Sequence, residues 1–333
     1  MRSRDITRYG VICALSVSCT LPAVRADDVS PQRVRNAVER VLPLLENGIA
    51  VSGGQKTCFT CHNQALPVLA LTEAREFGFA VRSEILQSGV SHTLEHLKRG
   101  EQQYREGRGQ GGAVLTAGYA LWTLESGAVS ANETTDAVVH YLLTHQSDRD
   151  HWTKAGRRPP SDGNEFTVTY TALRAVSRFA SELRQADRER RMATVREWLE
   201  SAIPADTEDA VFRLRGLRLA RASDDLIAKA VDRLLQEQRD DGGWAQTSGM
   251  DSDAYATGTV LAALMNRIPD DISDTKTLLN QQPVAAETDV GDAADQVVNE
   301  QPQTDASAEP PGRDDIGGGI PSQRLQSAVQ FLL

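Results

Sequence analysis

A pattern that occurs twice limits what this chain can fold into. In each copy an apolar helical segment reaches a glutamine and, six residues later, a tryptophan; the copies run from Ala137 to Trp152 and from Ala230 to Trp244. Each copy continues into a second apolar segment with helical spacing, over 166–179 and 255–265. Two helices joined by a turn cannot bury their apolar faces alone, so such units stack on one another. The pattern therefore predicts a helical-repeat architecture.

The other segments that we expect to be ordered also have the apolar spacing of helices. Helices are predicted over 31–47, 63–77, 83–98, 116–127, 188–202 and 209–222. Gly48, Gly53 and Gly54 are expected to loosen the chain after the first of these helices. The predicted fold class is therefore all-α.

The stretch from Gln238 to Leu264, QRDDGGWAQTSGMDSDAYATGTVLAAL, resembles the glutamine–tryptophan repeat of the squalene–hopene cyclase and prenyltransferase superfamily. Residues 57–79, 157–176 and 198–220 are similar to stretches of a bacterial branch of that family, in which exported proteins carry a CxxCH motif before the repeats. The resemblance covers most of residues 31–268. It implies an α/α toroid, in which outer helices surround a ring of inner helices.

The chain carries one CxxCH motif, Cys58-Phe59-Thr60-Cys61-His62, which is the attachment pattern of a c-type haem. Two thiols at this spacing can add across two vinyl groups of one porphyrin edge. The adjacent histidine then binds the iron as the proximal ligand. Cys58 and Cys61 are therefore the candidate residues for covalent attachment of haem c, and His62 is the candidate iron ligand. The motif directly precedes a predicted helix.

Other uses of the cysteine pair remain open at the level of sequence. Cys58 and Cys61 could form a disulfide, although so short a loop stabilises little. They could serve as a thioredoxin-like redox pair, but no strand–helix–strand pattern surrounds them. With His62 and a further histidine they could hold zinc, although three ligands within five residues suit haem better than tetrahedral zinc.

The sixth position of a haem iron has two candidate ligands near the motif in the sequence. His92 and His96 lie one turn apart on the helix predicted over 83–98. The competing interpretation places His96 in solvent and His92 partly buried against a neighbouring helix. In that case the iron would be five-coordinate and open to small ligands.

Residues 1–26 have the features of a secretory signal peptide. Three arginines, at positions 2, 4 and 8, precede an apolar run over 11–24, and Val24-Arg25-Ala26 offers a cleavage point. The prediction is export to the periplasm or the extracellular space, with no transmembrane segment in the mature chain. Without these residues, which hold four arginines and one aspartate, the 36 basic and 46 acidic residues become 32 and 45, a net charge of −13. This charge disfavours nucleic acid as a partner. A redox or protein partner is expected but is not specified.

The end of the chain departs from the repeat pattern. Residues 270–319 are acidic and almost free of aromatic residues, so they cannot bury enough surface to fold. The predicted organisation is a signal peptide over 1–26, a toroid domain over 27–268 with its motif at 58–62, a disordered acidic linker over 269–320 and a truncated repeat helix over 321–333. The ring is therefore expected to be incomplete. The last helix either docks on its open edge or is a remnant.

Terpene cyclase activity is not expected. The cyclases of the resembled family protonate an alkene with an acid from an Asp-x-Asp-Asp motif, whereas this chain has Asp251-Ser252-Asp253-Ala254. Asp253 is expected to cap a helix and Asp251 to lie in solvent. No cysteine follows Cys61, so the zinc site of a protein prenyltransferase is incomplete as well. Two functions from different classes remain: an exported haem protein for electron transfer or small-ligand sensing, and a binding scaffold with a structural cysteine pair.

Overall fold

The computed structural model describes residues 29–156, 164–265 and 321–333. Throughout these ranges the ordered elements are helices, and no strand occurs in them, which confirms the all-α prediction. The predicted signal peptide over 1–26 and the predicted acidic linker over 269–320 lie outside the described residues. No helix within the described ranges combines the length and apolar character that a membrane span requires.

The helices follow one another with short connections, and most lie where the apolar spacing predicts them. They are α1 (Pro31–Gln55), α2 (Leu66–Glu76), α3 (Ser83–Arg99), α4 (Glu101–Arg105), α5 (Ala113–Ser126), α6 (Glu133–Thr144), α7 (Glu165–Phe179), α8 (Gln185–Ser201), α9 (Thr207–Leu219), α10 (Asp224–Gln236), α11 (Ala254–Met265) and α13 (Ser322–Leu332). One turn of π-helix, Cys61–Ala65, directly precedes α2.

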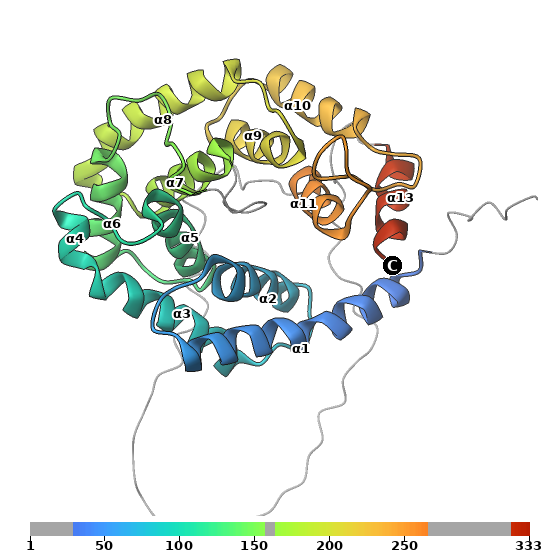
Figure 1. Ribbon diagram of the computed structural model, residues 1–333, viewed down its shortest axis with the longest axis horizontal. Coiled ribbons are helices and arrows are strands. Elements are labelled where there is room, and N and C mark those ends of the chain that lie inside the picture. The colour runs from blue at the N-terminus through green and yellow to red at the C-terminus, as the bar shows by residue number, and fades with distance from the viewer. Residues whose placement is uncertain (1–28, 157–163, 266–320) are drawn as a thin grey trace, which may run out of the picture.

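The helices form an outer and an inner layer along a curved path (Figure 1). The chain alternates between the layers, so that α2, α5, α7, α9 and α11 lie on the inside and α1, α3, α6, α8 and α10 on the outside. Consecutive inner helices pack on one another: α5 on α7, α7 on α9 and α9 on α11. Most of the fully buried apolar side chains belong to these inner helices and to the faces of the outer helices that pack against them.

Four inner helices run in the same direction, as the order of their contacts shows. Along α5 and α7, Gly118 lies against Thr171, and Glu125 pairs with Arg174 one to two turns later. The α7–α9 interactions rise together in the same way, from the electrostatic interaction of Glu165 with Asp209 to the ring contact of Tyr170 with Phe212. Between α9 and α11 the order is Glu208 with Tyr255, then Arg218 with Ala263. The N-terminal ends of these helices therefore share one end of the molecule.

The two tryptophan turns are built alike, which explains the repeat in the sequence. Trp152 and Trp244 are both fully buried, and each indole N–H donates to a carbonyl ten residues earlier, at 2.9 and 2.7 Å. Each tryptophan backbone N–H donates to a threonine hydroxyl of the following inner helix, Thr169 at 3.2 Å and Thr257 at 3.0 Å. One tryptophan thus ties the end of an outer helix to the start of the next inner helix.

Helix α1 is longer than predicted. It extends to Gln55 and includes Gly48, Gly53 and Gly54, which we expected to end it. Burial explains the difference, because Ile49 and Ser52 are packed inward in this last part, where α1 lies along α3. Packing of this kind outweighs the cost of about 1 kcal/mol that each helical glycine carries relative to alanine.

Helix α13 docks on the turn between α10 and α11. Its Ala328 is fully buried, and Phe331 and Ser327 lie against Gly243 and Gly242 of that turn. The Arg324 side chain donates to the carbonyl of Leu235 at 2.8 Å, capping the end of α10. The apolar face that we expected, formed by Leu325, Val329, Leu332 and Leu333, is only partly used, since Leu332 is 39% exposed.

Candidate functional site

The CxxCH motif lies in the connection between outer helix α1 and inner helix α2. Thr60 shapes it: its carbonyl accepts from the N–H groups of both Gln64 and Ala65, at 3.1 and 3.3 Å, which produces the wide turn Cys61–Ala65. In turn, the Thr60 N–H donates to the Gln64 side-chain Oε1 at 2.7 Å. Pro67 sits in the first turn of α2, where a missing N–H costs nothing. His62 therefore stands at the start of a helix, as predicted.

The two cysteines and the histidine of the motif are accessible in different degrees. Cys58 and His62 are exposed, and Cys61 is half-buried against the core. Cys58 and Cys61 are not joined by a disulfide in the structure. Phe59, between them, is only 7% exposed and anchors the loop. The motif thus presents two thiols and an imidazole on a loop that is fixed at its centre.

One face of α3 holds this loop through three side chains on successive turns. His92 Nε2 lies 3.3 Å from the Cys58 carbonyl oxygen. The His96 ring stacks on Phe59, with centroids 6.0 Å apart and planes at 25°. The Arg99 guanidinium donates to the Thr57 carbonyl. The loop is therefore held in place before any cofactor binds.

The two predicted distal candidates have different surroundings. His92 lies at the edge of the motif, in contact with the Cys58 backbone. His96 lies behind Phe59, and burial, reinforced by Arg99 and His92, lowers its pKa to about 4. Its Nε2 is buried without a hydrogen-bond partner among the described residues. The alternative placement of His96 in solvent is therefore wrong, whereas His92 is partly buried as that alternative expected.

The described residues do not offer a preformed metal site around the motif. Among the described residues, no three histidine, cysteine, aspartate or glutamate side chains converge in the manner of a metal site. A preformed tetrahedral zinc site with Cys58, Cys61, His62 and a second histidine is therefore absent from that part of the chain.

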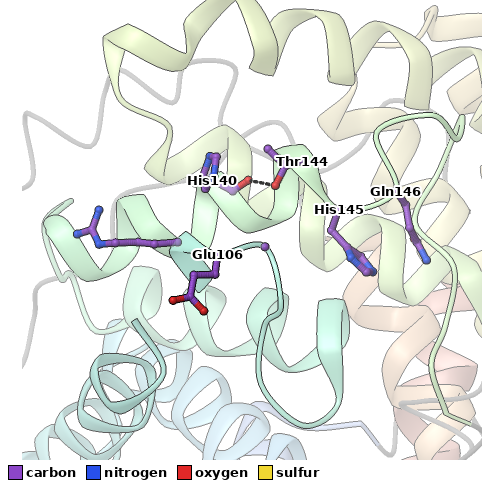
Figure 2. A pocket seen from close by; sticks show the side chains of 7 residues that line it. Glu106, His140, Thr144, His145 and Gln146 are labelled. Carbon is purple, nitrogen blue, oxygen red and sulfur yellow. Dashed lines mark hydrogen bonds between the residues drawn. The ribbon is translucent and has the colours of Figure 1, made fainter. Parts of the chain in front are cut away.

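A shallow hollow of about 450 Å³ lies elsewhere, between the loop after α4 and the end of α6 (Figure 2). His140, His145 and Gln146 line it together with Glu106. His140 Nδ1 lies 3.2 Å from an Arg184 nitrogen, and the His145 ring stacks on Tyr141 at 4.9 Å. Both histidines are thus engaged in packing, and the hollow includes none of the motif residues.

Inner helices α9 and α11 carry a buried acid that sequence reasoning missed. Glu208 is only 7% exposed, and the Tyr255 hydroxyl lies 3.1 and 3.2 Å from its two carboxylate oxygens. Desolvation by burial raises the Glu208 pKa to about 7, although the Tyr255 hydrogen bond and Arg215 favour the ionised form. In the sequence, Asp206-Thr207-Glu208-Asp209 is a common helix start, and nothing in it distinguishes the acid that turns inward.

The aspartates at the start of α11 have the structural roles expected of them. Asp253 Oδ1 accepts from the Ala256 N–H at 2.9 Å, which is an N-cap bond. Its Oδ2 accepts from the Gln246 side chain at 3.1 Å. Asp251 is exposed. Both carboxylate oxygens of Asp253 thus accept hydrogen bonds that hold the start of α11.

Comparisons of the chain with protein-family models, with curated proteins and with solved structures found no match.

Proposed function

We propose that this chain is an exported protein that carries one covalently attached haem c and uses it for electron transfer or small-ligand sensing. The observation that carries the proposal is the geometry of Cys58, Cys61 and His62. Two unbridged cysteines and an imidazole lie at the start of a helix, on a loop held by α3. Thioether bonds require thiols, and a ligating imidazole must be reachable, so this donor set fits haem c.

Each motif residue has a separate task in this proposal. Cys58 and Cys61 would hold the haem through thioether bonds, and His62 would be the protein ligand of its iron. The bound haem supplies reversible one-electron chemistry. The contacts of His92, His96 and Arg99 fix residues 57–59, on the N-terminal side of the motif.

The sixth iron position is assigned to His92 or to an exogenous small ligand. His92 supports this assignment because its Nε2 already lies 3.3 Å from the Cys58 carbonyl oxygen, at the exposed edge of the motif. His96 is disfavoured because Phe59 covers it and its ring is packed inside the hairpin.

The fold of the proposed haem protein is an α/α toroid of the squalene–hopene cyclase and prenyltransferase type. The support is the alternation of outer and inner helices, the common direction of four inner helices and the two tryptophan turns that share the same indole and backbone hydrogen bonds. Terpene cyclase chemistry is not part of the proposal, because the Asp253 side chain is already bonded to the backbone and to Gln246.

A haem assay tests the proposal. The full chain is expressed with its own leader in a bacterial host that has a cytochrome c maturation system, and the exported fraction is isolated. The expected result is a haem absorption that stays with the polypeptide after denaturation, at one haem per chain. The Cys58→Ser, Cys61→Ser double variant should lose it, and His62→Ala should lose it or yield an altered spectrum.

A matched control separates the motif from its surroundings. His140→Ala removes a histidine of α6 that contacts Arg184 rather than the motif, and should leave haem content and spectrum unchanged. His92→Ala should keep the covalent haem but change its spectrum if His92 is the sixth ligand. A colourless wild-type protein with Cys58 and Cys61 oxidised to each other would overturn the proposal in favour of the binding scaffold.

A further inference from the structure

Helix α1, in the outer layer (Figure 1), has two apolar faces, and only one of them is buried. Leu42 and Ile49 are buried on the first face, where α1 packs against α2 and α3. The second face is a row of five apolar residues and one glycine, which we call the α1 stripe: Val34, Ala37, Val41, Leu44, Gly48 and Val51. Leu44 is 71% exposed, and Val41 and Val51 are 47% and 46% exposed. The described part of the chain therefore leaves the largest side chains of the stripe open to solvent.

The spacing along the α1 stripe is that of a coiled-coil seam. Its members follow one another at intervals of three, four, three, four and three residues. This is the 3.5-residue repeat through which one helix packs along another. Single apolar side chains on a protein surface are ordinary, but a row of them in unbroken register marks a contact surface. The stripe therefore has the form of a seam for a second helix.

The α1 stripe is complementary to itself when a second copy of the helix runs in the opposite direction. A twofold axis at the centre of the stripe produces three kinds of pair: Val41 with Leu44, Ala37 with Gly48, and Val34 with Val51. The larger side chains thus lie opposite larger ones, and the smallest residue lies opposite the next smallest. Pairs matched in this way allow the two helices to approach along the whole seam.

Gly48 has no purpose within a single chain that explains its place in the stripe. A Cβ at this position would meet no atom within 4 Å, so the fold of one chain has room for a larger residue. Glycine is also a poor helix former compared with alanine. Close approach of a second helix, with the partner's Ala37 opposite, gives this glycine a role.

The charges of α1 favour the antiparallel direction over the parallel one. The N-terminal half of the helix carries three basic side chains and one acidic one, which are Arg33, Arg35, Arg40 and Glu39. Residues 47–55, at the other end, carry no charged side chain. Parallel pairing would place two basic halves side by side, and like charges in an interface disfavour it. Antiparallel pairing places each basic half beside an uncharged one.

We propose that two copies of this chain associate through the α1 stripe as an antiparallel, twofold-symmetric dimer. A second copy is the partner because each member of the stripe has its match, in size and in charge, on the same helix. The stripe spans about 26 Å at about 1.5 Å per residue. A contact of this length lies at the lower end of interface sizes, so we expect a dissociation constant in the micromolar range.

The dimer leaves both CxxCH motifs accessible. The twofold axis lies near the middle of α1, and the motif follows the C-terminal end of the helix at Gln55. The motifs of the two copies therefore lie at opposite ends of the helix pair. The contact uses no motif residue, so the inference does not depend on the proposed haem function.

The test is the molar mass of the full chain, measured by analytical ultracentrifugation between about 1 and 200 μM, a range that brackets a micromolar dissociation constant. The wild-type protein should pass from the mass of one chain to that of two. Leu44→Glu, which places two charges at the centre of the seam, should remain a single chain. Ala50→Glu adds the same charge at an exposed position of α1 outside the stripe and should dimerise as wild type does. A wild-type protein that stays a single chain throughout would overturn the proposal.

A substitution at Gly48 separates pairing from folding. Gly48→Leu should raise the thermal midpoint of the single chain, because leucine is the better helix former and its Cβ meets no neighbour. In the dimer the added side chain would collide with the partner's Ala37, so the dissociation constant should rise at least tenfold. A dissociation constant equal to that of wild type, in a protein with the raised midpoint, would contradict this register.

Disulfide crosslinking determines the direction of the pair. Val34→Cys and Val51→Cys chains are mixed and oxidised, and the linked peptides are identified by mass spectrometry. The expected link joins position 34 of one chain to position 51 of the other. Leu183→Cys, at a 98% exposed position on another element, should give no such link with either chain. Links between two copies of position 34 would show parallel pairing and overturn the proposal.

Discussion

Single buried polar side chains determine how the stability of this protein changes with pH and with substitution. Glu208 has a pKa near 7 in the folded chain, raised by desolvation from 4.5, its ordinary value. Below pH 4.5 the side chain is protonated in both the folded and the unfolded chain, and its favourable contribution is fully present. As pH rises through 4.5 towards 7, the unfolded chain releases its proton first, so the free energy of unfolding falls.

The expected consequence is a pH-dependent stability difference between wild type and Glu208→Gln. At pH 5 the two proteins should differ little. At pH 8 the variant should be more stable, by up to about 3 kcal/mol from the size of the pKa shift. Urea unfolding at both pH values measures this difference. A difference that is constant with pH would show that Glu208 does not titrate in this range.

The threonine hydroxyls that accept hydrogen bonds from the tryptophan N–H groups are a second example of buried polar groups that affect stability. Thr257 accepts from the Trp244 N–H at 3.0 Å, at a site where both residues are fully buried. Thr257→Val keeps the shape of the side chain but leaves that N–H without an acceptor. We expect a loss of about 1–3 kcal/mol in the free energy of unfolding.

Thr259→Val provides the matched control for this substitution. Thr259 lies two residues further along α11, and its hydroxyl donates to the carbonyls of Tyr255 and Ala256 within the helix. Its loss should change the free energy of unfolding by less than about 0.5 kcal/mol. Equal losses for the two variants in denaturant unfolding would mean that the tryptophan turn does not depend on its threonine.

The elements of the fold were predictable where local spacing determines them. Helices α3 and α11 begin and end within one or two residues of their predicted ranges. The end of α1 was not predictable, because three glycines indicate a break that long-range packing against α3 overrides. The position of His96 was missed for the same reason: its partner, Phe59, is 37 residues away in the sequence, on another element.

At the scale of whole helices, the contribution of docked α13 to stability can be measured. Ala328 is fully buried in the contact with the α10–α11 turn, so Ala328→Asp would place a charge where no water reaches. We expect α13 to detach and the thermal midpoint to fall by several degrees, about 2–4 °C for each kcal/mol lost in a domain of this size.

Two further proteins make this experiment decisive. Gln326→Asp adds the same charge on the exposed side of α13 and should leave the midpoint nearly unchanged. Deletion of residues 321–333 should lower the midpoint as much as Ala328→Asp does. A deletion without effect on the midpoint would contradict a stabilising contact between α13 and the turn.

At the scale of the whole molecule, the repeat determines the two-layer pattern but not the chemistry on its inner side. The tryptophan spacing is local, so it could be recognised in the sequence and predicts hairpins. Which inner side chains meet depends on the alignment of neighbouring helices. Glu208 and Tyr255 come from two helices and lie more than 40 residues apart in the sequence, and no local pattern connects them. The motif at Cys58–His62 was found because all its members are consecutive.

The common direction of the inner helices gives the molecule an axis with two unlike ends. Each α-helix carries the equivalent of about half a positive charge at its N-terminus and half a negative charge at its C-terminus. In α5, α7, α9 and α11 these partial charges point the same way, whereas the outer helices α6 and α10, which end where α7 and α11 begin, oppose them. At the end of the molecule where the inner helices begin, positive partial charges therefore lie on the inner side of the layers and negative ones on the outer side. A charged molecule meets a different field on each side, and added salt would reduce that difference.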